Sequence, residues 1–224
     1  MPTAASKCLI QVTAFSVWLI LVGSTFAWLT LYGSMPGPPS DVPESWPSST
    51  EINRCEGQQH LLVFLHPECP CTRATLDNLQ PLIRSDDLQV TLICFGDFQP
   101  QSNNSLGGCY RELQSWNDRP QVTLVSDVTG QEAERFGAST SGHCLLYDRE
   151  GKLVYNGGVT SSRGHRGANT GLSILKSTLV EFDSAESSYP VFGCPLLEKK
   201  PEDLPLDSPP SLDPPECCEG RFHA

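Results

Sequence analysis

Residues 61–83, LLVFLHPECPCTRATLDNLQPLI, contain the pattern that decides the fold of this chain. Leu61 to Leu65 form an uninterrupted apolar run, which is typical of a buried strand. The sequence therefore predicts a strand that runs directly into a helix, with Cys69 and Cys71 at the junction. The helix is expected over 72–83, where these apolar residues recur at helical spacing: Ala74, Leu76, Leu79, Leu82 and Ile83.

The residues that follow predict strands and helices in alternation. A polar turn, Asp148-Arg149-Glu150-Gly151, separates the last two expected strands and predicts a hairpin. This order indicates an α/β fold in which one mixed sheet is flanked by helices. The expected strands are 88–95, 121–126, 143–147 and 152–155, and the expected helices are 109–116, 127–136 and 171–182.

The N-terminal region predicts a transmembrane helix over residues 9–32. This stretch carries no acidic or basic side chain, is long enough to span a bilayer, and follows Lys7. Because positive charge favours the cytoplasmic side, we expect a membrane-anchored protein whose domain lies on the extracytoplasmic (periplasmic) side. A cleaved signal peptide is the alternative, since Ser24-Thr25-Phe26-Ala27 offers small residues, although the apolar run continues beyond them.

The composition also divides the chain and excludes two classes of function. A formal net charge of −11 repels phosphate backbones, so no nucleic acid is expected as a partner. The 10 cysteines include no two CxxC knuckles, which removes support for a structural zinc ribbon. The expected parts are a short segment 1–8, the helix 9–32, a Pro/Ser-rich linker 33–53, one domain over 54–197, and an acidic, Pro-rich disordered tail 198–224.

The chain carries four distinctive motifs: HPECPCTR at 66–73, SGH at 141–143, GGVTSSRGH at 157–165 and PVFGC at 190–194. Together they resemble the thioredoxin-like superfamily of membrane-anchored thiol-disulfide oxidoreductases, most closely its RedB-like subgroup. The resemblance covers residues 61–196 and implies a thioredoxin-like domain that acts on thiol or disulfide protein substrates and is reset by a redox partner. It also implies that the loop after the last strand lies beside the cysteines.

The sequence departs from the usual pattern of that superfamily at two positions. Only Pro70 separates Cys69 from Cys71, whereas the usual redox motif has two residues between its cysteines. Gly142 stands at the position that corresponds to the superfamily's cis-proline, which normally contacts a substrate peptide through its backbone. The resemblance therefore specifies the fold more closely than the mechanism.

Cys69 and Cys71 are the expected catalytic residues. At a helix N-terminus the macrodipole and the unpaired N–H groups stabilise a thiolate. We expect Cys69 to form a mixed disulfide with the substrate and Cys71 to resolve it, without a cofactor. The expected supporting residues are Pro70, Arg73, Gly142, His143 and His165, with Arg163 and Arg166 adding positive charge if their loop covers the site.

A copper-binding or copper-delivery protein is the alternative function. In that case Cys69, Cys71 and His143 would ligate Cu(I), because soft thiolates select that ion. A redox-silent interaction domain on a tether is a third possibility.

The remaining cysteines receive weaker assignments. Cys94 and Cys144 lie in apolar strands and are expected to pack as small core residues. Cys109 and Cys194 are left open as resolving or structural partners, with a Cys55–Cys194 pair conceivable. Cys217-Cys218 lies in the expected tail and is assigned no active role. Asn103-Asn104-Ser105 fits a glycosylation sequon, a short pattern that often occurs by chance.

Overall fold

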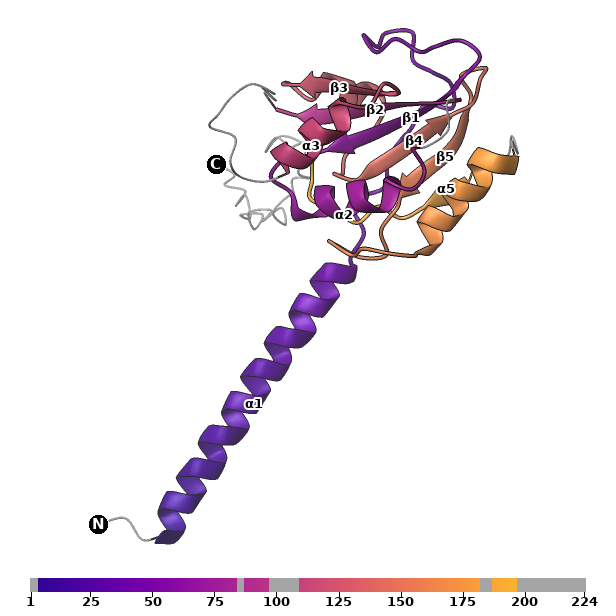
Figure 1. Cartoon of the computed structure of the whole chain (residues 1–224). Helices are drawn as coiled ribbons and strands as arrows, with labels where there is room; N and C mark the ends of the chain where they lie inside the picture. The colour runs from indigo at the N-terminus through magenta and orange to yellow at the C-terminus, as the bar shows by residue number, and fades with distance from the viewer. Residues whose placement is uncertain (1–3, 84–86, 97–108, 182–186, 197–224) are drawn as a thin grey trace, which may run out of the picture.

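A computed structural model describes residues 4–83, 87–96, 109–181 and 187–196. A long helix, α1 (Ala4–Ser34), projects from a domain that is built around one sheet (Figure 1). The elements of the domain, in chain order, are β1 (Gln59–Leu65), α2 (Pro70–Leu79), β2 (Leu88–Phe95), α3 (Tyr110–Asn117), β3 (Val122–Asp127), α4 (Gln131–Arg135), β4 (His143–Tyr147), β5 (Leu153–Gly158), α5 (Thr170–Glu181) and β6 (Ser187–Tyr189).

The sheet has the strand order β3-β2-β1-β4-β5-β6. Strands β1, β2 and β3 are parallel, β4 is antiparallel to both β1 and β5, and β5 is parallel to β6. The predicted mixed α/β layer order is confirmed, and the arrangement is thioredoxin-like. Strand β6 was not predicted, because Ser187-Ser188-Tyr189 is short and has no apolar alternation.

Every residue of β1 is buried, because both faces of the sheet are covered. Leu61, Val63 and Leu65 belong to a core cluster with residues of α2, α3 and α5. Leu62 and Phe64 belong to a second cluster, which includes residues of α4 and of β4. Each fully buried aliphatic or aromatic side chain stabilises the fold by about 1.5–3 kcal/mol. The continuous apolar run at 61–65 is therefore a consequence of a strand that is enclosed on two sides.

The segment predicted to be a linker, residues 33–53, contributes to this second face. Val42 and Trp46 pack against the second cluster. The Trp46 ring meets the Phe136 and Tyr147 rings edge-on, with centroid distances of 5.3 and 5.2 Å. The segment is therefore not a free linker: the Gly37 N–H donates to the Val191 carbonyl oxygen at 2.8 Å, and the apolar area of Trp46 packs the second half of the segment on the sheet.

Helix α2 begins two residues before the predicted start. Pro70 occupies the first turn, where its missing N–H group leaves no intrahelical bond unmade. The regular helix ends at Leu79, and Leu82 and Ile83 still pack on the core from the turn that follows. The early start places Cys69 at the N-cap.

One apolar stretch of α1 is long enough to cross a membrane by length and composition. Leu9–Ser34 contains 26 residues, which corresponds to about 39 Å of helix against a hydrocarbon core of about 30 Å. None of its most apolar window is buried against the domain. The predicted tail 198–224 with Cys217-Cys218, and the sequon at 103–105, lie outside the described residues.

Candidate functional site

The two sequence-predicted cysteines lie where β1 passes into α2. Cys69 is the N-cap residue, with φ −81° and ψ 125°, and Cys71 lies in the first helical turn. The turn is held by two hydrogen bonds to the His66 carbonyl oxygen, from the Cys69 N–H at 3.0 Å and from the Thr72 hydroxyl at 2.7 Å. Both cysteines are buried. The thiols therefore occupy fixed positions at the positive end of the helix.

A third thiol, that of Cys194, completes the site. The Cys69 and Cys194 Sγ atoms are 2.9 Å apart. The sulfur atoms of Cys69, Cys71 and Cys194 all lie within 4.8 Å of one another. Cys194 is half-buried and follows β6, so it reaches the site from a distant part of the chain. The sequence left its role open because no spacing rule connects it with the Cys-Pro-Cys motif.

The three thiols have strongly different acidities. A hydrogen bond from the Cys71 thiol, followed by others from Cys194, lowers the pKa of Cys69 to about 4, although burial opposes this shift. The neighbouring Cys69 thiolate, together with burial, raises the pKa of Cys71. Burial, and then the hydrogen bond to Cys69, raises the pKa of Cys194 to about 11. The arrangement therefore holds one thiolate, on Cys69, between two protonated thiols.

A pocket of about 350 Å³ opens beside Cys69. Arg73 on its wall is ion-paired with Glu112 of α3, and Arg166 is paired with Asp77 of α2 at 3.1 Å. The pocket therefore brings positive side chains to the thiolate while their charge is partly balanced by carboxylates. Its lining consists of Glu68, Cys69, Pro70, Arg73, Cys109, Gly164 and Arg166.

The loop of residues 161–169 lies beside the cysteines. Gly164 lines the pocket, and its backbone hydrogen-bonds Cys71. The positive charge of Arg163 acts on Cys194 and lowers its pKa, against the larger opposing effect of burial. His165 is exposed, and its carbonyl oxygen accepts a hydrogen bond from the Asn78 amide at 3.4 Å.

The loop of residues 139–142 forms the opposite border of the site. The Ser141 hydroxyl accepts a hydrogen bond from the His66 N–H at 3.0 Å and lies 3.2 Å from the Thr72 hydroxyl. Gly142 has φ +92°, a conformation that glycine adopts without strain, and its N–H donates to the Phe64 carbonyl oxygen at 2.7 Å. The Ser141-Gly142 turn thus packs against the start of α2.

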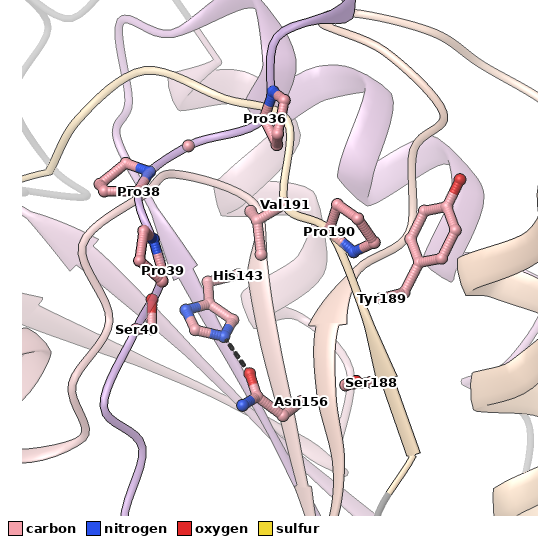
Figure 2. Close-up of a pocket in the computed structure, with 11 residues that line it drawn as sticks. Pro36, Pro38, Pro39, Ser40, His143, Asn156, Ser188, Tyr189, Pro190 and Val191 are labelled. Atoms are coloured by element: carbon pink, nitrogen blue, oxygen red, sulfur yellow. Dashed lines mark hydrogen bonds between the residues drawn. The ribbon is translucent and has the colours of Figure 1, made fainter.

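The side chain of His143 lies outside the thiol cluster. His143 pairs in register with Phe64, and its Nε2 is 2.7 Å from the Asn156 Oδ1 (Figure 2). Both residues line a pocket of about 420 Å³, together with Ser40 and the prolines that precede it. Burial lowers the pKa of His143 to about 4, so the imidazole is neutral at neutral pH. The candidate metal-binding group consists of Cys69, Cys71 and Cys194. His143 does not belong to it.

The other described cysteines fall into two groups. Cys94 and Cys144 are fully buried in strands, and burial raises the pKa of Cys94 to about 12. Cys109 is buried near the site, and its N–H donates to the Pro67 carbonyl oxygen at 2.8 Å. Cys55 is exposed and lies shortly before the first residue of β1. Cys194 contacts Cys69, which lies beyond the last residue of β1. A Cys55–Cys194 disulfide cannot form in this fold, because its Cα atoms would have to lie within about 7 Å.

No protein-family model matches the sequence, and no curated protein is similar to it. Solved structures with a similar fold include an uncharacterized conserved protein from Geobacillus kaustophilus, with 17% identity over 74% of this chain and 93% of that chain, at a TM-score of 0.50. The pneumococcal exposed lipoprotein thioredoxin from Streptococcus pneumoniae has 20% identity over 56% and 86% of the two chains, at a TM-score of 0.37. A secreted Mycobacterium tuberculosis disulfide oxidoreductase has 14% identity over 56% and 83%, at 0.36. The likeness to the Geobacillus kaustophilus protein is one of fold.

Proposed function

We propose that this chain is a membrane-tethered thiol-disulfide oxidoreductase of the cell envelope, with the Cys69-Pro70-Cys71 motif at its redox centre. The observation that carries the proposal is the position of Cys69 at the N-terminus of α2, with two further thiols within 4.8 Å. A thiolate at that point is stabilised by the helix, and the thiolate is the species that attacks a disulfide. The motifs shared with the RedB-like subgroup support the same function and a place in that subgroup.

The reaction begins with the Cys69 thiolate. It attacks one sulfur of a substrate disulfide, forms a mixed disulfide with it, and releases the other substrate sulfur as a thiolate, which takes up a proton. A second thiol of the chain then loses its proton, attacks the Cys69 sulfur and releases the second substrate thiolate. Two electrons pass from two protein thiols to the substrate, and a redox partner returns them. The same steps in reverse oxidise a dithiol substrate.

Helix α1 supplies the tether in this proposal. Its apolar stretch exceeds the thickness of the hydrocarbon core, and Lys7 precedes it. Positive charge at the N-terminus favours an orientation in which the domain lies on the periplasmic side. The thiols of an envelope protein meet an oxidising environment, which suits a disulfide-exchange centre.

The activity can be tested by the reduction of insulin with dithiothreitol, using the detergent-solubilised full chain. We expect wild-type protein to accelerate insulin reduction and Cys69→Ser to abolish the acceleration, because Cys69 carries the thiolate of the described thiol cluster. Cys55→Ser is the matched control, since Cys55 is exposed at the other end of β1. Equal acceleration by Cys69→Ser and wild type would refute the proposed function.

Copper binding is the second candidate, and the cluster of three thiols favours it. Cys69, Cys71 and Cys194 place three sulfur atoms within 4.8 Å of one another, which is a soft donor set suited to Cu(I). This set differs from the expected one, in which His143 was the third ligand. The same cysteines would then carry the ion to a recipient.

The copper candidate is tested by titrating the reduced chain with Cu(I) against a competing chelator. We expect a site that is weakened by Cys69→Ser, Cys71→Ser and Cys194→Ser but not by His143→Gln, because the imidazole is bonded to Asn156. An affinity in wild type no higher than that of the Cys69/Cys71 double variant would eliminate copper.

A further inference from the structure

The segment after β6 holds Cys194 against the loop of residues 139–142 as an added strand would. The Ser141 N–H donates to the Cys194 carbonyl oxygen at 2.8 Å, and the Leu196 N–H donates to the Ser139 carbonyl oxygen at 2.9 Å. Extended segments that pair in this way are positioned by their main chain. The Cys194 side chain is therefore fixed by backbone contacts.

Two further features restrict the position of this segment. A Cβ atom on Gly193 would lie 1.8 Å from the Ser141 carbonyl oxygen, so only glycine permits this close approach. The Arg163 guanidinium donates to the Gly193 carbonyl oxygen and also lies over the Tyr32 ring, 4.7 Å from its centroid. The segment that carries Cys194 is thus held from the loop on one side and from the end of α1 on the other.

On the basis of the proposed function, we propose that Cys194 is the resolving thiol and that the intramolecular disulfide of the oxidised protein joins Cys69 to Cys194. The Sγ atoms are 2.9 Å apart, so they need approach by only about 0.9 Å to reach the ~2.05 Å of a disulfide.

A bond between Cys69 and Cys71 has a larger geometric cost. It would close a ring through Pro70, whose φ is fixed by its own ring. Cys71 also lies in the first turn of α2, so such a ring would have to distort that turn. The Cys71 sulfur lies within 4.8 Å of the Cys69 and Cys194 sulfurs. Cys71 therefore acts as a neighbour that supports the attacking thiolate, and it stays reduced through the cycle.

The geometry also separates the substrate from the resolving thiol. Cys69 lines the pocket beside α2, together with Arg73 and Arg166, whereas Cys194 contacts Cys69 without lining that pocket. A substrate sulfur therefore reaches Cys69 through the pocket, and Cys194 attacks from a different side. This separation suits a displacement in which the entering and leaving sulfurs are on opposite sides of the central one.

In the mixed disulfide, Cys69 is bonded to the substrate sulfur. The Cys194 thiol loses its proton and its sulfur attacks the Cys69 sulfur, so the Cys69–substrate bond breaks as the Cys69–Cys194 bond forms. The substrate sulfur leaves as a thiolate and takes up a proton. The Cys69 and Cys194 thiols are oxidised together by two electrons, and the substrate disulfide is reduced.

The test uses the detergent-solubilised full chain, reduced and then mixed with glutathione disulfide. The reaction is stopped with acid, free thiols are blocked, and peptides are mapped by mass spectrometry. We expect a Cys69–Cys194 cross-link in wild type and in Cys71→Ser. In Cys194→Ser and Cys194→Ala the glutathione adduct on Cys69 should persist about tenfold longer or more, because resolution then requires a second molecule of thiol.

The outcomes distinguish this inference from the proposed function. A Cys69–Cys71 or Cys69–Cys109 cross-link in wild type, or clearance of the adduct at the wild-type rate in both Cys194 variants, overturns the inference alone. Absence of any glutathione adduct on Cys69 in every variant overturns the proposed function as well. Circular dichroism melting of each variant, with Cys55→Ser as the matched control, separates a lost thiol from a lost fold.

Discussion

Replacement of Cys71 by alanine tests how the Cys69 thiolate is stabilised. The hydrogen bond from the Cys71 thiol is the largest cause of the low pKa of Cys69, which is about 4. A hydrogen bond to a charged group contributes about 1.5–3 kcal/mol, which corresponds to about 1–2 pKa units at ~1.36 kcal/mol per unit. We therefore expect Cys71→Ala to raise the pKa of Cys69 to about 5 to 6.

The assay is the rate of iodoacetamide alkylation at Cys69 between pH 3 and pH 9, read by peptide mass spectrometry. At pH 5 about 90% of Cys69 is thiolate, against ~0.03% of an ordinary thiol with a pKa of ~8.5, a ratio of about 3000. A low-pKa thiolate is intrinsically less nucleophilic, and this lowers its alkylation rate about 60- to 180-fold. The net advantage over a free cysteine peptide at pH 5 is roughly 20- to 50-fold, and at pH 7 it is lost.

The wild-type profile should thus be flat above about pH 5, and the midpoint should move upward in Cys71→Ala. Cys55→Ala is the control that should leave the midpoint unchanged, because Cys55 is remote from the cluster. A wild-type midpoint near that of an ordinary thiol, or an unchanged midpoint in Cys71→Ala, would show that the hydrogen bond does not set the acidity of Cys69.

Three further predictions concern topology, the thiol cluster and acid stability. A reporter that is active only outside the cytoplasm, fused after Leu196, should be active, and activity of a cytoplasm-specific reporter at that point would refute the orientation. Gly193→Ala should reduce Cys69–Cys194 cross-linking, because its Cβ would lie 1.8 Å from the Ser141 carbonyl oxygen; cross-linking at the wild-type yield would contradict this. The pKa of His143 is lowered to about 4 in the folded protein. Between about pH 6.5 and pH 4 only the unfolded chain gains a proton at this residue, so the free energy of unfolding decreases as the pH is lowered, by up to about 2 kcal/mol at pH 5. His143→Gln should therefore lose less of its thermal stability than wild type between pH 7 and pH 5, and an equal loss would exclude this histidine as a cause.

Local sequence patterns anticipated the elements of the domain because their signals are short in range. The apolar run at 61–65 and the helical spacing that follows it are properties of neighbouring residues. The polar turn at 148–151 separates β4 from β5 in the same way. Element ends were less accurate, as for α2, because Pro70 is compatible with the first helical turn and its presence alone does not mark where that turn begins.

Tertiary packing decided the composition of the site. The sequence by itself determined that Cys69 and Cys71 stand at a strand-to-helix junction, since that follows from their place between two apolar patterns. It contained no rule for the distance between Cys69 and Cys194, which are far apart along the chain and come together only through the pairing of the last segment with the loop at 139–141. It also placed His143 near the thiols, because proximity in sequence to Ser141 does not reveal which face of the sheet a side chain occupies. Strand residues alternate between faces, so the register of β4 against β1, a long-range property, directed the imidazole toward Asn156 and left the third position beside Cys69 to a thiol.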